Sequence, residues 1–162
     1  MATWKMIGDV TFNQDIDATS TTQKAPLGAT VKARDIDQTG YGDADFIYGV
    51  GVASTAAGDL VTLDGSGFTT VRADGGDTGK VAVAMSANVA NQYGWYCVNG
   101  TVAITSGTVA DGEVLYLTST AGSVDDAVVA GDKIYGAFSV AASSGGTTLS
   151  SISYPFVTDA SN

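Results

Sequence analysis

The side chains that most often carry catalysis are scarce in this chain. Histidine is absent from the 162 residues, which removes the commonest general base, the Ser-His-Asp and Cys-His arrangements and most zinc sites. Catalysis would then depend on carboxylates, yet Glu113 is the single glutamate, and many aspartates lie beside glycine, as solvated turn carboxylates do. Paired carboxylates for glycoside hydrolysis are correspondingly disfavoured. We therefore expect no catalytic residues and a protein that is not an enzyme.

Cys97 lies in the crowded segment NQYGWYCVNG and is the only cysteine, so an internal disulfide is excluded. A reactive thiol needs a cationic neighbour, and no Lys, Arg or His lies within a dozen residues on either side. The period of two along a strand puts Tyr93, Trp95 and Cys97 on one face. Tyr96 and Val98 then lie on the other face. We interpret the segment as a strand covered on both faces, with an inert thiol.

The sequence DIDQTGYGDADF resembles a calcium-binding loop in its spacing. The residues that match positions one, three, five, six and nine of such a loop are Asp35, Asp37, Thr39, Gly40 and Asp43. The last position holds Phe46 where the calcium loop has a bidentate glutamate, and no helix is predicted on either side. We interpret the segment as an acidic turn between strands, and we expect neither a metal nor a cofactor.

The charge balance restricts the partners. The net charge of −10 disfavours nucleic acid, because neutralising phosphates requires clustered Lys and Arg and the chain has seven in all. Residues 1–34 are slightly basic, so the acidic excess belongs to the rest. No segment has the pattern of a secretory signal or the roughly 18 apolar residues of a membrane span. We expect synthesis and assembly in a reducing cytoplasm, with no membrane partner.

The order of apolar runs and turns predicts an all-β fold. Short alternating runs are separated by glycine turns at spacings of roughly 8 to 15 residues, as in a small antiparallel β-barrel or sandwich. We expect an extended N-terminal arm over residues 1–25, with a short strand around residues 6–12, a globular domain over 26–158 and a C-terminal tail over 159–162. A short helical turn is expected at residues 86–92.

A weak internal repeat indicates a two-fold relation within the domain. FIYGVG at 46–51 resembles WYCVNG at 95–100, and AGDLVTLD at 57–64 resembles DGEVLYLT at 111–118. GKVAVAMSA at 79–87 resembles GDKIYGAFSVA, which begins 52 residues later. Two copies of a strand, hairpin and strand would bury their apolar faces against each other.

The N-terminal segment supplies the candidate partner contacts. Its apolar side chains, Trp4 among them, have no periodicity of their own, so we expect the arm to order against a partner with Trp4 as its anchor. The expected steering charges are Lys5, Lys24, Lys32 and Arg34. Trp95 is expected in the core and Trp4 outside it. The alternative is an N-terminal strand that completes the protein's own barrel.

Several segments together resemble the small β-barrel decoration, or head cement, proteins of tailed bacteriophages. They are APLGATVKARD, AGDLVTLD, GKVAVAMSANVANQYGWYCVNGTVAI, ADGEVLYLTSTAG and the late YPFV, so the similarity spans roughly Pro26 to Val157. The resemblance implies a virion protein that binds the outside of the expanded capsid, commonly as a trimer, and bridges major capsid subunits without any catalytic residue. Two other functions remain open: a phage tail or head-fibre β-module, and a carbohydrate-binding or adhesin-like domain.

Overall fold

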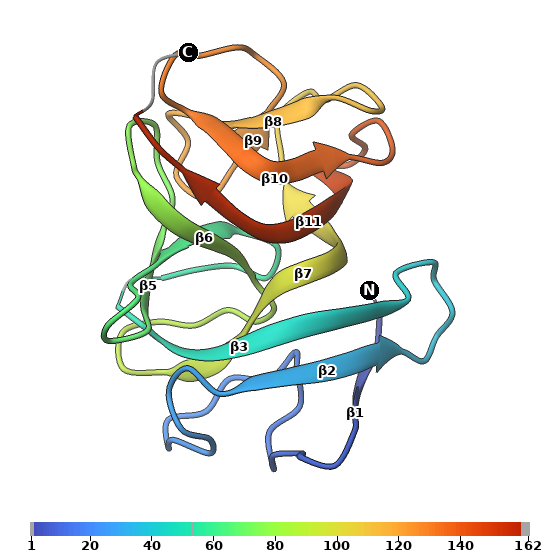
Figure 1. Cartoon of the computed structure of the whole chain (residues 1–162), viewed down its shortest axis with the longest axis vertical. Coiled ribbons are helices and arrows are strands. Elements are labelled where there is room, and N and C mark those ends of the chain that lie inside the picture. The colour runs from blue at the N-terminus through green and yellow to red at the C-terminus, as the bar shows by residue number, and fades with distance from the viewer. Residues whose placement is uncertain (1, 53, 160–162) are drawn as a thin grey trace.

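The computed structural model describes residues 2–52 and 54–159, which form eleven strands and no helix (Figure 1). The strands are β1 (Trp4–Ile7), β2 (Thr30–Asp35), β3 (Asp43–Gly51), β4 (Leu60–Leu63), β5 (Thr69–Arg72), β6 (Gly79–Ala84), β7 (Tyr93–Thr105), β8 (Val114–Leu117), β9 (Val124–Asp125), β10 (Lys133–Ser139) and β11 (Thr147–Val157). The predicted all-β class is confirmed. None of the described segments is an apolar helix long enough to cross a membrane.

The helical turn expected at residues 86–92 is wrong. This segment is a loop with short turns, in which the Asn88 N–H donates to the Ser86 carbonyl oxygen and the Gln92 N–H donates to the Val89 carbonyl oxygen, each at 3.1 Å. Asn88 is fully buried in it, and its side-chain amide donates to the Tyr96 hydroxyl at 2.7 Å. An asparagine that makes a tertiary hydrogen bond of this kind favours an irregular backbone over a helix.

Five strands close a ring, which we call the first ring. β3 pairs in parallel with β5, and the ring continues through antiparallel pairs of β5 with β4, β4 with β6, and β6 with β7. β7 then returns to β3 over six paired positions, from Val50 with Tyr93 to Asp45 with Asn99. A ring of this kind leaves none of its five strands as a free edge within it.

The same pairing scheme recurs after β7, in what we call the second ring. β8 pairs with β9 and with β10, β10 pairs with β11, and β11 returns to β7, all antiparallel. A parallel bridge from Ser106, just after β7, to Val124 of β9 takes the place of the parallel β3–β5 pair. β7 to β11 therefore repeat the arrangement of β3 to β7, and the predicted internal repeat is confirmed. β7 belongs to both rings, which lie in the lower and upper halves of Figure 1.

Gly100 lets the shared strand serve both rings. Its φ of +127° is a conformation that L side chains rarely adopt, and a Cβ there would lie 2.6 Å from the Cβ of Ala44 on β3. The β3–β7 register shifts just before it. Beyond the shift the buried side chains change from odd to even positions, from Trp95 and Cys97 to Val102 and Ile104, all within one core cluster.

The two faces of β7 contribute to two separate clusters. Tyr96 and Val98 belong to a small cluster with residues of β4 and β6, which fills the first ring. Trp95 and Cys97 belong to the main core on the opposite face, and the partly buried Tyr93 packs against it. The predicted alternation along NQYGWYCV is therefore confirmed, and so is the prediction that this strand is covered on both faces.

The N-terminal segment packs against its own chain. β1 pairs antiparallel with β2 at one end of the sheet, and Trp4 and Ile16 are buried members of the main core. The Trp95 indole N–H donates to the Gln14 carbonyl oxygen at 3.1 Å, and the Tyr48 hydroxyl donates to the Gln14 side chain. The expectation that this arm orders only against a partner is wrong, because residues 2–29 cover aromatic side chains of β3 and β7 that would otherwise face water.

Candidate interaction surface

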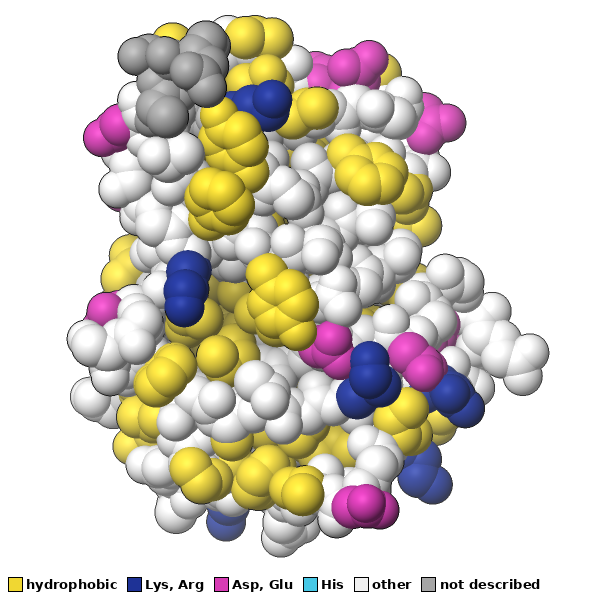
Figure 2. Space-filling view, in the orientation of Figure 1, with side chains coloured by type: hydrophobic (Ala, Val, Ile, Leu, Met, Phe, Trp, Pro, Cys, Tyr) yellow, Lys and Arg dark blue, Asp and Glu magenta, His cyan; other side chains and the backbone are white. Residues whose placement is uncertain are grey.

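Three of the predicted contact residues lie together on the outer face of β1 and β2. The register places Lys5 opposite Arg34 and Arg34 opposite Asp43 of β3, and it places Lys32 opposite Asp45. Arg34 donates two hydrogen bonds to Asp43, at 2.7 and 2.9 Å, and the Lys32 ammonium lies 2.8 Å from an Asp45 oxygen. The pairs Arg34–Asp43 and Lys32–Asp45 form a row of charged pairs with Lys5 beside it, and basic and acidic side chains are visible over β2 and β3 in Figure 2.

The charged pairs neutralise each other in place. The Asp43 side chain hydrogen-bonds Arg34, which lowers the pKa of Asp43. Burial alone would raise the pKa of Asp45, but hydrogen bonds from Lys32 and from the Asn99 amide outweigh it and lower that pKa below its ordinary value. Lys32 and Arg34 therefore carry charges that are already partnered, which makes them weak steering charges for another molecule.

The other two predicted contacts lie elsewhere. Trp4 is 7% exposed and packs edge-to-face on Phe46, with ring centroids 5.0 Å apart. The expectation that Trp4 is an exposed anchor outside the core is therefore wrong, since its ring is part of the main core. Lys24 lies in the loop before β2, beside residues 12–20 and away from the row of charged pairs.

The calcium-like loop holds its carboxylates with its own backbone. Asp35 is buried and accepts hydrogen bonds from the N–H groups of Asp37, Thr39 and Tyr41 and from the Thr39 hydroxyl. Burial would raise its pKa, and these donors lower it instead. Asp43 is held by Arg34, as described above. No group of three potential metal-ligating side chains occurs among the described residues.

Cys97 has the surroundings of a packing residue. Its side chain is fully buried, and that burial raises the pKa of the thiol to about 12. The thiolate, which is the nucleophilic form, is therefore disfavoured at neutral pH.

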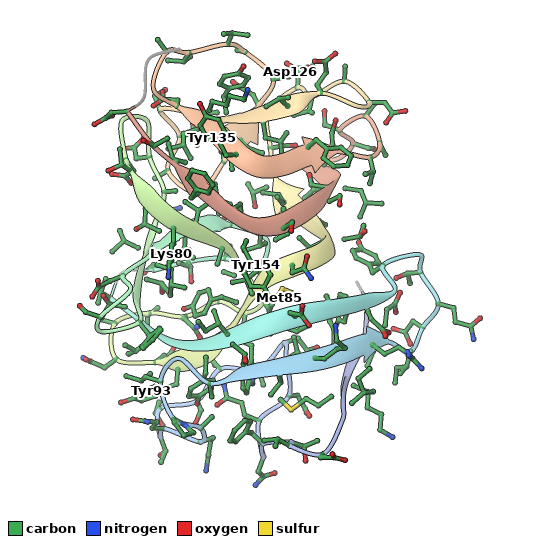
Figure 3. The ribbon with its side chains drawn as sticks, in the orientation of Figure 1. Lys80, Met85, Tyr93, Asp126, Tyr135 and Tyr154 are labelled. Carbon is green, nitrogen blue, oxygen red and sulfur yellow. The ribbon has the colours of Figure 1, made fainter. Side chains whose placement is uncertain are left out.

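The outer face of β10 and β11 exposes a group of aromatic rings that sequence reasoning did not single out. We call it the aromatic face, and its members are Tyr135, Phe138, Tyr154 and Phe156. Phe138, Tyr154 and Phe156 are 47%, 62% and 46% exposed. Tyr135 and Phe156 stack with centroids 5.3 Å apart, and the Lys133 ammonium lies 5.1 Å from the centre of the Tyr135 ring. Hydrophobic side chains lie over these strands in Figure 2. Figure 3 shows Tyr135 at β10 and Tyr154 reaching from β11 toward β3, where its hydroxyl donates to an Asp45 oxygen at 3.5 Å.

A bulge between β10 and β11 sets the direction of Tyr154. Gly136 of β10 stands opposite residues 153–155 of β11, where the register shifts, and a Cβ on Gly136 would lie 2.7 Å from the Ser153 carbonyl oxygen. Tyr154 itself has a φ of +46°, the left-handed region that a tyrosine seldom occupies. In this conformation the Tyr154 hydroxyl donates to an Asp45 oxygen of β3 at 3.5 Å while the residue stays 62% exposed.

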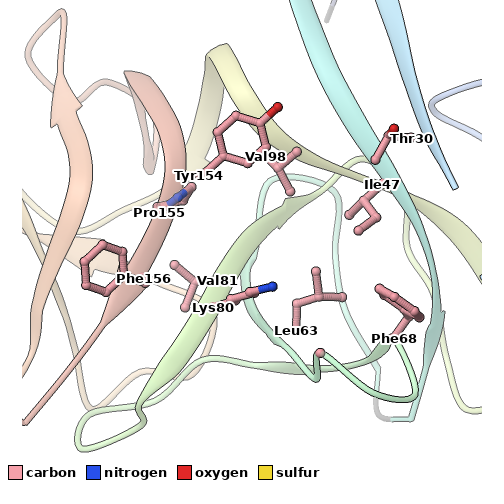
Figure 4. Close-up of a pocket in the computed structure, with 11 residues that line it drawn as sticks. Thr30, Ile47, Leu63, Phe68, Lys80, Val81, Val98, Tyr154, Pro155 and Phe156 are labelled. Carbon is pink, nitrogen blue, oxygen red and sulfur yellow. The ribbon is translucent and has the colours of Figure 1, made fainter. Parts of the chain in front are cut away.

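An apolar groove of about 350 Å³ adjoins the aromatic face at the open end of the first ring (Figure 4). We call it the apolar groove, and the apolar side chains that line it are Ile47, Leu63, Phe68, Val81, Val98 and Pro155. Lys80, Tyr154 and Phe156 also line it. On β6 Lys80 has the same parity as Ala82, which faces the inside of the first ring, so its ammonium emerges at the mouth of that ring. The groove is thus an apolar hollow with a cation beside it.

Sequence reasoning missed this surface because its signal is divided between distant segments. KIYGAFS and SYPFV each contain two aromatics, but the bulge at Gly136 breaks the period of two that would have assigned them to one face. The remaining lining residues of the groove come from five other strands and from the loop between β4 and β5. The sequence signal for the aromatic face is a pair of aromatics separated by small residues in each strand of one hairpin.

No protein-family model matches the chain, and no curated protein is significantly similar to it. The groove and the aromatic face therefore have to be interpreted from their own chemistry.

Proposed function

We propose that this chain is a non-enzymatic virion structural protein, a capsid decoration or cement protein that binds the outer surface of a phage head. It bridges major capsid subunits as a homo-oligomer, and the decoration proteins that its sequence resembles are commonly trimers. The observation that carries the proposal is the uncovered aromatic face beside the apolar groove. Exposed aromatic side chains at a hollow are typical of protein interfaces, whose strongest contacts are aromatic anchors in desolvated pockets. The sequence resemblance supplies the capsid as the partner.

The chemistry of the candidate reactive groups supports a binding role. Histidine is absent, Cys97 is buried with a raised pKa, and Asp35 is held by hydrogen bonds from its own loop. The buried aromatic core and the two rings provide a rigid support for a surface, which is what a clamp between capsid subunits needs.

The test is the location and number of copies in purified phage particles. We expect gold-labelled antibody to this chain to decorate the whole head, and quantitative mass spectrometry to find copies comparable in number to the major capsid protein. A handful of copies at one vertex or on the tail would replace the proposal with a tail or head-fibre module. Absence from particles, together with binding to a glycan array, would replace it with a carbohydrate-binding domain.

A second measurement ties binding to the surface. Purified protein is added to expanded shells that lack it, and the bound fraction is measured by sedimentation. We expect Phe138→Asp and Tyr154→Asp to bind at least about tenfold more weakly than the wild type. Val71→Asp, on the exposed side of β5, is the matched control that leaves binding unchanged. Equal binding by all four proteins would exclude the aromatic face as the contact.

A further inference from the structure

Lys80 gives the apolar groove a charge that its own chain does not neutralise. The residue is exposed, it makes no ion pair with any described residue, and Figure 4 shows its side chain extending among Leu63, Val81 and Val98. The chain has a net charge of −10, with 17 acidic side chains against seven basic ones, so an unpaired lysine at an apolar hollow is unusual among its charged groups. The groove therefore complements an apolar side chain that has carboxylates beside it.

The same chain presents such a group at another place. The loop between β9 and β10, residues 126–132, which we call the valine loop, carries Val128 at 81% exposure and Val129 at 45%. Asp125 and Asp126 lie three and two residues before Val128, and both are half-buried. The loop is held in shape because the Asp125 carboxylate accepts from the Ala127 N–H at 3.0 Å and the Asp126 carboxylate accepts from a neighbouring loop at 2.8 Å.

We propose that the valine loop of one copy inserts into the apolar groove of a second copy. Val128 and Val129 would enter the hollow, and Asp125 and Asp126 would lie near Lys80. The inference rests on the self-association that is part of the proposed function, and it names the two surfaces that perform it. Because Asp125 and Asp126 of one copy would lie near Lys80 of the other, the valine loop suits the groove better than an uncharged apolar segment does.

The contact is heterologous, because it joins two different patches of the same chain. The groove faces the viewer in the orientation of Figure 3, beside Lys80 and Tyr154, whereas Asp126 marks the valine loop at the far end of the molecule. Each copy then offers one free loop and one free groove. Such contacts form a closed ring when the rotation between copies closes, and a fibre when it does not.

The test is sedimentation velocity of the full chain over a concentration series, in the absence of any shell. We expect the wild type to form species larger than a dimer, and Val128→Asp and Lys80→Glu each to raise the dissociation constant by about tenfold or more. Val10→Asp and Lys24→Glu are matched controls, since Val10 is 62% exposed and Lys24 lines a different hollow, together with residues 12–20. Weakening by the controls equal to that of the test variants would overturn the proposal.

Mixing the two test variants gives the sharpest result. Val128→Asp retains an intact groove and Lys80→Glu retains an intact valine loop, so an equimolar mixture should form a one-to-one dimer and nothing larger. A mixture that stays monomeric would overturn the proposal, as would a wild type that remains monomeric up to about 100 µM. Shell binding is measured separately. A monomeric wild type that still binds shells would refute this contact and leave the capsid-binding part of the proposed function standing, whereas a self-associating chain that does not bind shells would refute the proposed function alone.

Discussion

The aromatic side chains of the two rings differ in what covers them. On the first ring Phe46, Tyr48 and Trp95 are fully buried, because the N-terminal segment folds over β3 and β7 and adds Trp4 and Phe12 to the cluster. On the second ring the outer aromatics of β10 and β11 have no such cover. The first group stabilises the fold, and the second group is left for another chain.

The comparison explains how a repeated architecture can have two roles. Both rings use the same order of strand pairs, but only the first is preceded by a segment long enough to wrap its outer face. Covering apolar surface with the same chain costs backbone entropy and gains about 25 cal/mol per Å² of apolar area buried. Leaving it uncovered keeps that free energy available for association.

Deleting residues 2–20 should have the largest effect. The deletion removes Trp4 and Ile16 from the core and exposes the Trp95 ring, so we expect it to remove most of the roughly 5 to 15 kcal/mol that stabilises a domain. Urea unfolding followed by circular dichroism measures this loss. A truncated protein with the unfolding midpoint of the full chain would show that the segment is a dispensable arm after all.

Trp95→Ala should cost about 3 to 5 kcal/mol, because it removes a fully buried ring and its hydrogen bond to Gln14. Phe156→Ala is the matched substitution on the uncovered surface, and there we expect a loss within about 1 kcal/mol. Both values come from the same urea titrations. Similar losses for the two variants would remove the distinction between the two surfaces.

Trp4→Ala should cost about 3 kcal/mol, since its ring packs on Phe46 and Tyr41 at the edge of the core. Fluorescence quenching by acrylamide checks the burial of Trp4 without replacing Trp4 itself. We expect Trp4 and Trp95 to be protected in the unbound protein, with Trp95→Phe isolating the signal of Trp4. Free access of the quencher to Trp4 would contradict its burial.

The sequence was sufficient for the parts of the fold that depend on local patterns. Strand alternation placed Trp95 and Tyr96 on opposite faces, and the repeat anticipated the duplicated pairing. The position of Trp4 depends on pairing between β1 and β2 and on contacts with Phe46, more than 40 residues away, which no local period encodes. The aromatic face was likewise hidden, because the bulge at Gly136 changes which side of β10 each residue occupies.

The smallest expected effect is that of acid on the charged pairs at the edge of the first ring. Asp43 and Asp45 have pKa values in the folded protein below the ordinary value of 3.8, so each contributes stability that is fully present above that value. The contribution is lost as pH falls below about 4 and through the folded pKa, where the unfolded chain binds protons first. Exposed pairs contribute little, so the fall should be gradual.

Asp45→Asn isolates one of these pairs. The variant keeps a hydrogen-bonding side chain near Asn99 but loses the ion pair with Lys32, so it should be less stable than the wild type at pH 7. Because acid also removes that charge from the wild type, the difference in free energy of unfolding should narrow as pH falls from about 5 towards 2. Raising the salt concentration at pH 7 should narrow it as well. Urea titrations at each pH measure the difference, and a gap that stays constant or widens in acid would mean that Asp45 acts through packing instead of charge. Phe138→Ala, which removes no charge, is the control, and it should differ from the wild type by the same amount at every pH.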